Sequence, residues 1–113
     1  MIKLQIMDLV EEYQLNKTII NNTDLEISLL TNSDDIQELK NRKSAAESRI
    51  TLTENYDYSY ILSDTETSII KSAYMDKPIE KIHEKFNLSE DDYDYWLSLI
   101  KKKLKRVSIY IAQ

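Results

Sequence analysis

Residues 62–107 read LSDTETSIIKSAYMDKPIEKIHEKFNLSEDDYDYWLSLIKKKLKRV, and helix start and stop signals divide this stretch into three helices. The segment Ser63-Asp64-Thr65-Glu66 has capping-box spacing, in which a serine and a glutamate three residues later bond each other's backbone NH groups. A helix is therefore predicted to begin at Ser63. It should end before Pro78, because proline fits the first turn of a helix and disrupts a helix interior.

A turn at Asn87 is predicted to separate a short second helix from a long third one. Ile79, Ile82 and Phe86 recur at helical spacing, and Asn87 tolerates the left-handed backbone conformation that often ends a helix. Ser89 is the predicted N-cap of the third helix, and the acids that follow it complement the helix dipole. The apolar stripe of this helix comprises Tyr93, Trp96, Leu97, Ile100, Leu104 and Val107. This arrangement predicts a trihelical helix-turn-helix.

Several positions in this stretch also match a known helix-turn-helix pattern. They are Leu62-Ser63 with Glu66 at the start of the first helix, Ile82 in the second, Phe86-Asn87-Leu88-Ser89 at the turn, and Lys103-Leu104 late in the third. On these residues the stretch resembles the DNA-binding region 4 of sigma-70-type factors. Preceded by a helical N-terminal half, it is similar to small phage and prophage transcription regulators of the ArpU/RinA late-gene type. The resemblance implies a transcription regulator whose partner is double-stranded DNA.

Glycine is absent from the whole chain of 113 residues, and proline occurs once. Without glycine the chain lacks P-loops, dinucleotide-binding fingerprints, nucleophile elbows and most two-residue hairpins. It also has no cysteine and one histidine, His83, so thiolate chemistry and histidine-rich metal sites are excluded. These absences favour an all-α protein that is not an enzyme and that has no metal and no cofactor.

The N-terminal half has mainly apolar residues at helical spacing. They step by four and three along one seam, which comprises Ile2, Ile6, Leu9, Tyr13, Asn16, Ile20, Thr23, Ile27 and Leu30. Asn21-Asn22-Thr23 is a weak helical stretch, and Thr23-Asp24-Leu25-Glu26 has the spacing of another capping box. We therefore expect helices over 2–20 and 24–50, with a further candidate break near Thr31-Asn32-Ser33. Their seam either packs within one chain or forms a homodimer.

Three segments are expected: a helical arm or hairpin over 1–53, a linker over 54–62 and a helix-turn-helix domain over 63–113. Aromatic and polar residues alternate through Thr53–Tyr60. Because no strand partner is evident for these residues, we expect an extended connector. Its tyrosines either stack on nucleotide bases or pack against the helices, and packing is favoured because no basic residue adjoins them.

Charges separate along the third predicted helix. Residues 89–98 contain four acids and no base, whereas residues 99–106 contain five bases and no acid. A recognition helix enters the major groove by its N-terminal residues, and basic side chains contact phosphates. The candidate DNA-binding residues are therefore Lys77, Lys81, Lys85, Ser89, Asp92, Tyr93, Tyr95, Lys101, Lys102, Lys105 and Arg106.

The same acids support an alternative in which the helix-turn-helix scaffold binds a protein. Four carboxylates would face the phosphates of DNA and repel them, and the net charge of −5 disfavours a nucleic-acid coat. An acidic surface rich in tyrosine instead suits a basic groove on RNA polymerase, a host factor or a nucleic-acid-binding enzyme. The candidate residues are Tyr56, Asp57, Tyr58, Glu90, Asp91 and Asp94.

Hydrophobic residues make up 42% of the chain and charged residues 31%, which is the balance of a globular protein. No apolar run approaches the roughly 18 residues of a membrane span, and no signal-peptide pattern opens the chain. A soluble, cytoplasmic protein with no membrane partner is expected.

Overall fold

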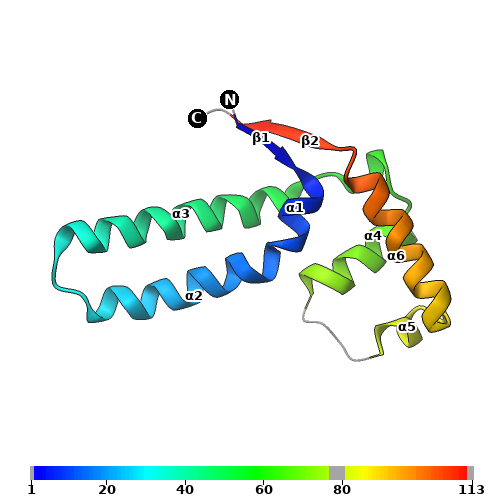
Figure 1. The fold of residues 1–113 in the computed structure, drawn as a ribbon, viewed down its shortest axis with the longest axis horizontal. Coiled ribbons are helices and arrows are strands. Elements are labelled where there is room, and N and C mark those ends of the chain that lie inside the picture. The colour runs from blue at the N-terminus through cyan, green and yellow to red at the C-terminus, as the bar shows by residue number, and fades with distance from the viewer. Residues whose placement is uncertain (1, 77–80, 112–113) are drawn as a thin grey trace. The chain divides into compact units, whose positions relative to one another are not determined.

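A computed structural model describes residues 2–76 and 81–111 of the chain, which is mostly helical with a small two-stranded sheet (Figure 1). Residue contacts divide it into two compact units. The hairpin unit comprises residues 12–56, and the composite unit comprises the residues up to Glu11 together with those from Asp57 on. The all-α expectation therefore holds at the level of class, and the sheet is an addition to it.

The sheet pairs the two ends of the composite unit. Strand β1 (Ile2–Gln5) runs antiparallel to β2 (Ser108–Ile111), and the backbone NH of Ile6 donates to the Val107 carbonyl at 3.1 Å (Figure 1). The helix expected to begin at residue 2 is thus wrong for the first four positions. A strand needs a partner, and here that partner lies at the opposite end of the sequence, beyond the reach of local periodicity.

The core of the composite unit joins residues from both ends of the chain. Helix α1 (Ile6–Glu11) packs against α6 (Glu90–Leu104) and against the π-helical turn Lys71–Met75. The core side chains that are at most 1% exposed are Ile6, Met7, Leu9, Val10, Ile69, Ile70, Ile100 and Leu104. Contacts therefore group the first residues with the C-terminal half. The expected segments 1–53, 54–62 and 63–113 stay a prediction.

The helix start predicted at Ser63 is confirmed. Helix α4 (Asp64–Ile70) begins with a complete capping box, in which the Glu66 NH donates to Ser63 Oγ at 3.1 Å and the Ser63 NH donates to Glu66 Oε1 at 3.0 Å. The π-helical turn continues α4 to Met75, ahead of Pro78 as expected. Pro78 and Ile79 lie outside the described residues, and the short helix α5 spans Ile82–Lys85.

The turn and N-cap predicted before the last helix are also confirmed. Asn87 has a φ of 56°, the left-handed conformation that asparagine tolerates. Ser89 Oγ accepts a hydrogen bond from the Asp92 NH at 3.1 Å and so caps α6. Helix α6 then buries Ile100 and Leu104 and packs against α4.

The hairpin unit consists of α2 (Tyr13–Leu29) and α3 (Ser33–Asn55), which run antiparallel (Figure 1). The break expected at residues 21–23 is wrong. The Thr23 hydroxyl donates to the Ile19 carbonyl at 2.6 Å and lies buried, so this residue stays inside α2 and caps nothing. The chain turns instead at the further candidate break, where Asn32 Oδ1 accepts hydrogen bonds from the Asp34 and Asp35 NH groups.

The extended connector expected over Thr53–Tyr60 is wrong as well. Helix α3 continues to Asn55, and a 3-10 turn follows over Tyr58–Tyr60. The Asp57 carboxylate accepts hydrogen bonds from the Ser59 hydroxyl and backbone NH, and these bonds lower the pKa of Asp57. Because this local bonding competes with an extended backbone, aspartate and serine favour turns.

Candidate functional site

Helix α6 carries opposite charges at its two ends. Glu90, Asp91 and Asp92 occupy its first turn, and Lys101, Lys102 and Lys103 occupy its last turn. Acids near a helix N-terminus and bases near its C-terminus both complement the helix dipole, typically by 0.3–1 kcal/mol each in about the first or last turn. Part of the charge separation predicted to be functional therefore serves the helix itself.

Two of the basic residues on α6 are engaged within the composite unit. Lys103 Nζ lies 2.7 Å from Glu66 Oε2, and Lys101 Nζ lies 5.3 Å from the centre of the Tyr74 ring. Burial alone would raise the pKa of Glu66, but hydrogen bonds from Lys103 and Ser63 outweigh burial and lower it. Lys103 thus helps to hold α6 on α4, and Lys101 helps to hold it on the π-helical turn that follows α4, which leaves both less available to a phosphate.

The remaining predicted phosphate contacts are distributed over two helices. Lys102, Lys105 and Arg106 are exposed at the C-terminal end of α6. Lys85 is exposed on α5, with its amine 3.2 Å from Ser72 Oγ, and Lys81 is exposed with a φ of 63°. Lys77 lies outside the described residues. The structure therefore leaves a basic cluster of Lys102, Lys105 and Arg106 at one end of α6.

The predicted groove-facing residues fall into two groups. Tyr95 is 67% exposed and Asp92 is exposed, so both can reach a ligand. The hydroxyl of Ser89 is occupied as the cap of α6, and Tyr93 is half-buried, which raises the pKa of its phenol. Only part of the predicted set therefore presents free side-chain area.

Sequence reasoning missed two residues on the outer face of α6. Trp96 is 36% exposed and Leu99 is 37% exposed, and Leu99 neighbours Tyr95, four positions earlier, and Trp96, three positions earlier, on the helix surface. The sequence placed Trp96 in the buried stripe. The available signal was the helical periodicity, which places Trp96 at the edge of the apolar stripe formed by Tyr93, Leu97 and Ile100 and not at its centre.

The residues predicted for protein binding are also divided. Glu90, Asp91 and Asp94 are exposed on α6, and Asp57 is exposed as the cap of the 3-10 turn. Tyr58 is only 3% exposed and its hydroxyl lies 3.9 Å from Met75 Sδ, so it belongs to the core. Tyr56 is half-buried. The packing role that was favoured for these tyrosines therefore describes Tyr58.

A hollow of about 450 Å³ lies where α5 meets the start of α6. Its lining comprises Lys81, His83, Glu90, Tyr93 and Asp94, and His83 Nε2 lies 3.9 Å from Glu90 Oε1. Within residues 2–76 and 81–111, no cluster of histidine, aspartate or glutamate is placed to hold a metal ion. The hollow is a mixed-charge surface feature at the end of the candidate recognition helix.

Comparison of the chain with protein-family models, with curated proteins and with solved structures gave no match. In the part of the chain that the structure describes, no helix combines the length and the apolar character that crossing a membrane requires.

Proposed function

We propose that the chain is a transcription regulator of the phage or prophage late-gene kind, which binds double-stranded DNA through a helix-turn-helix of α4, α5 and α6. The observation that carries the proposal is the turn at Asn87 followed by the Ser89 cap of α6. Ile100 and Leu104 anchor the opposite end of α6 in the core. The first turn of α6 is thereby left exposed, and that turn is the part of a recognition helix that enters the major groove.

The charges of α6 should make the affinity for DNA of unrelated sequence low, so that binding depends on the DNA sequence. Lys102, Lys105 and Arg106 are free to contact phosphates, whereas the acids in the first turn repel them by on the order of 1 kcal/mol each at close range. Asp92 is exposed and can accept a hydrogen bond from a cytosine amine in the major groove. Affinity on an unrelated sequence should therefore depend almost wholly on the basic cluster.

A salt series tests the DNA-binding proposal. Binding to a pool of short random-sequence duplexes is measured by electrophoretic shift for the native chain and for Lys102→Ala/Lys105→Ala/Arg106→Ala. Log affinity falls as log salt rises, and each lost phosphate contact should make this slope less steep by about 0.9. The slope of the triple variant should therefore be smaller in magnitude by roughly 2 to 3. Lys40→Ala, at an exposed site of α3, is the control and should leave the slope unchanged. Absence of any shift at the lowest salt would overturn the proposal.

A second candidate function is supported by the outer face of α6. Tyr95, Trp96 and Leu99 are exposed there, and the exposed acids Glu90, Asp91 and Asp94 precede them on the same helix. Exposed aromatic side chains are enriched where proteins bind proteins, because each supplies a large contact area and tyrosine and tryptophan add a hydrogen bond. This face would suit a basic groove that normally holds phosphates, such as one on RNA polymerase, a host factor or a nucleic-acid-binding enzyme.

One double variant separates the two candidates because its expected effects have opposite signs. Asp91→Lys/Asp94→Lys should strengthen binding to random-sequence DNA, since two repulsive charges become attractive. The same variant should abolish recovery of purified RNA polymerase in a pull-down if the acids meet a basic protein groove. Unchanged recovery would count against a protein-directed role of these acids with that partner, and unchanged DNA affinity would count against an approach to DNA by this end of α6.

A further inference from the structure

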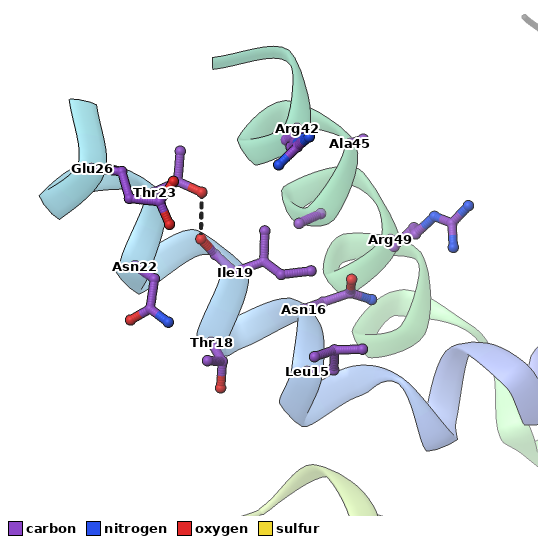
Figure 2. Close-up of a pocket in the computed structure, with 11 residues that line it drawn as sticks. Leu15, Asn16, Thr18, Ile19, Asn22, Thr23, Glu26, Arg42, Ala45 and Arg49 are labelled. Carbon is purple, nitrogen blue, oxygen red and sulfur yellow. Dashed lines mark hydrogen bonds between the residues drawn. The ribbon is translucent and has the colours of Figure 1, made fainter. Parts of the chain in front are cut away.

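A groove of about 600 Å³ runs along one face of the hairpin unit, between α2 and α3. Leu15, Asn16 and Ile19 line it from α2, and Ala45 and Ala46 line it from α3. Figure 2 shows Asn16 and Ile19 pointing from α2 toward α3. The floor of the groove is thus largely apolar around the Asn16 amide, and polar side chains, among them Asn22 and Arg49, complete the lining.

The hairpin unit has little apolar core of its own. The residues buried along the middle of its seam are Asn16, Thr23 and Ala46, which are polar or small. Leu15, by contrast, is 60% exposed at the edge of the groove. Since two helices bury only one stripe each, a helical hairpin ordinarily needs a further layer to cover its apolar face.

Asn16 supplies the observation that points to an occupant of the groove. It is 6% exposed, and among the described residues its Nδ2 has no hydrogen-bond partner. A buried amide donor without an acceptor is costly, so native structures rarely leave one unpaired. Asparagine at a helical seam is a known device for fixing the register and number of associated helices.

The two edges of the groove carry opposite charges, so the groove is complementary to a second copy of itself. Glu26 lies on the α2 edge, and Arg42, which also pairs with Glu38 of its own helix at 3.4 Å, lies on the α3 edge. Asp24 on α2 and Lys43 on α3 form an ion pair at 2.7 Å. Glu26 and Arg42 lie within two positions of this pair, so they lie at a similar level of the hairpin. A two-fold axis along the groove would lay α2 of one copy on α3 of the other, and each Glu26 would then face Arg42 of the second copy.

We propose that this groove binds the same groove of a second copy of this chain, which makes a four-helix bundle dimer. The two-fold axis brings both Asn16 amides to the same height at the centre of the bundle, where each Nδ2 donates to the other copy's Oδ1. Ile19, Ala45 and Leu15 form the apolar contact around them. Tyr13 and Thr23, on the seam that the sequence predicted, are buried within the hairpin, and Asn16 lies where that seam adjoins the groove face that the dimer uses.

The oligomeric state of the full chain tests this proposal. Sedimentation equilibrium over a range of concentrations should give a dimer for the native chain. Ala45→Glu should yield a monomer, because it buries two like charges in the interface; Ala45 is exposed in a single chain, so folding is preserved. Ser44→Glu, at an exposed position outside the groove, is the matched control and should remain dimeric. A native chain that stays monomeric, or a dimer unaffected by Ala45→Glu, would overturn the proposal.

A charge exchange tests the orientation of the two copies. Glu26→Arg alone and Arg42→Glu alone should each weaken the dimer by about tenfold, because every interface contains two copies of the pair. The double exchange should restore the native dissociation constant. Failure of the double exchange to restore it would exclude the proposed packing of α2 on α3 of the second copy. If the groove instead binds a ligand or another protein, the native chain should be monomeric, and that result would overturn the proposal.

Discussion

The composite unit and the hairpin unit bury different kinds of residue. In the composite unit Ile6, Leu9, Ile100 and other large apolar side chains are at most 1% exposed. In the hairpin unit the buried set includes Asn16, Thr23 and Thr53, while Leu29 is 83% exposed. The short N-terminal segment thus belongs to the core of the C-terminal half, whereas the longer hairpin between them has a thin seam of its own.

Truncation of a core leucine should produce the largest difference between the two units. Leu9→Ala removes a side chain that is 1% exposed and leaves a cavity, so it should lower the free energy of unfolding by about 3 kcal/mol. Leu29→Ala, at an 83% exposed position of the hairpin unit, should change it by less than about 0.5 kcal/mol. Urea denaturation of both variants checks the contrast. Equal losses would contradict the difference in burial between Leu9 and Leu29.

Removal of the Glu66 carboxylate should give the next largest effect. Glu66→Gln removes the charge of a buried carboxylate that pairs with the half-exposed Lys103 and holds α6 to α4, and it should lower the free energy of unfolding by about 2 kcal/mol at neutral pH. Glu38→Gln breaks the exposed pair with Arg42 in the hairpin unit, and it should lower the free energy of unfolding by at most about 0.5 kcal/mol. Urea denaturation at neutral pH compares the two losses.

The stability that Glu66 contributes should depend on pH, and its lowered pKa gives the direction of that dependence. The folded pKa of Glu66 is lowered, so its stabilising contribution is fully present above the ordinary value of 4.5. The contribution disappears as the pH falls through the lowered folded pKa. The stability difference between the native chain and Glu66→Gln should therefore shrink on acidification. A difference that grew on acidification would be inconsistent with a lowered pKa.

A substitution at the turn before α6 should give the smallest effect of the three. Asn87 has a φ of 56°, and alanine pays more than asparagine for that conformation, so Asn87→Ala should cost about 1 kcal/mol. Asn87→Gly should be neutral or stabilising. Asn21→Ala, inside α2 of the hairpin unit, should act in the opposite direction, because alanine has the higher helix propensity. Thermal unfolding of the three variants ranks them, and a loss with Asn87→Gly larger than with Asn87→Ala would contradict the role of the turn.

The local signals of the composite unit were predictable from its sequence. The caps at Ser63 and Ser89 and the turn at Asn87 each depend on residues within three or four positions, so the pattern alone identifies them. The same was true of buried seam positions such as Tyr13 and Leu9. Hydrophobic spacing carries that information even where the helix boundaries are wrong.

The candidate site was predictable only in part, because several of its members are controlled by distant partners. Lys103 pairs with Glu66, 37 positions earlier, and Lys101 lies over Tyr74, so the basic half of α6 is smaller than its sequence indicates. The exposure of Trp96 depends on how α6 is rotated against α4. No local pattern reports that rotation.

A mostly helical chain without glycine-dependent sites, the caps and turn around α6, and the separation of charge along that helix can all be read from the sequence alone. Three features depend on the folded chain: Ile2–Gln5 is a strand, α1 packs in the core of the C-terminal half, and some of the cations of α6 are taken up by partners. Caps and turns form between neighbouring residues, so neighbouring letters encode them. Strand pairing, core filling and ion pairing join residues far apart in the chain, and they exist only once the chain has folded.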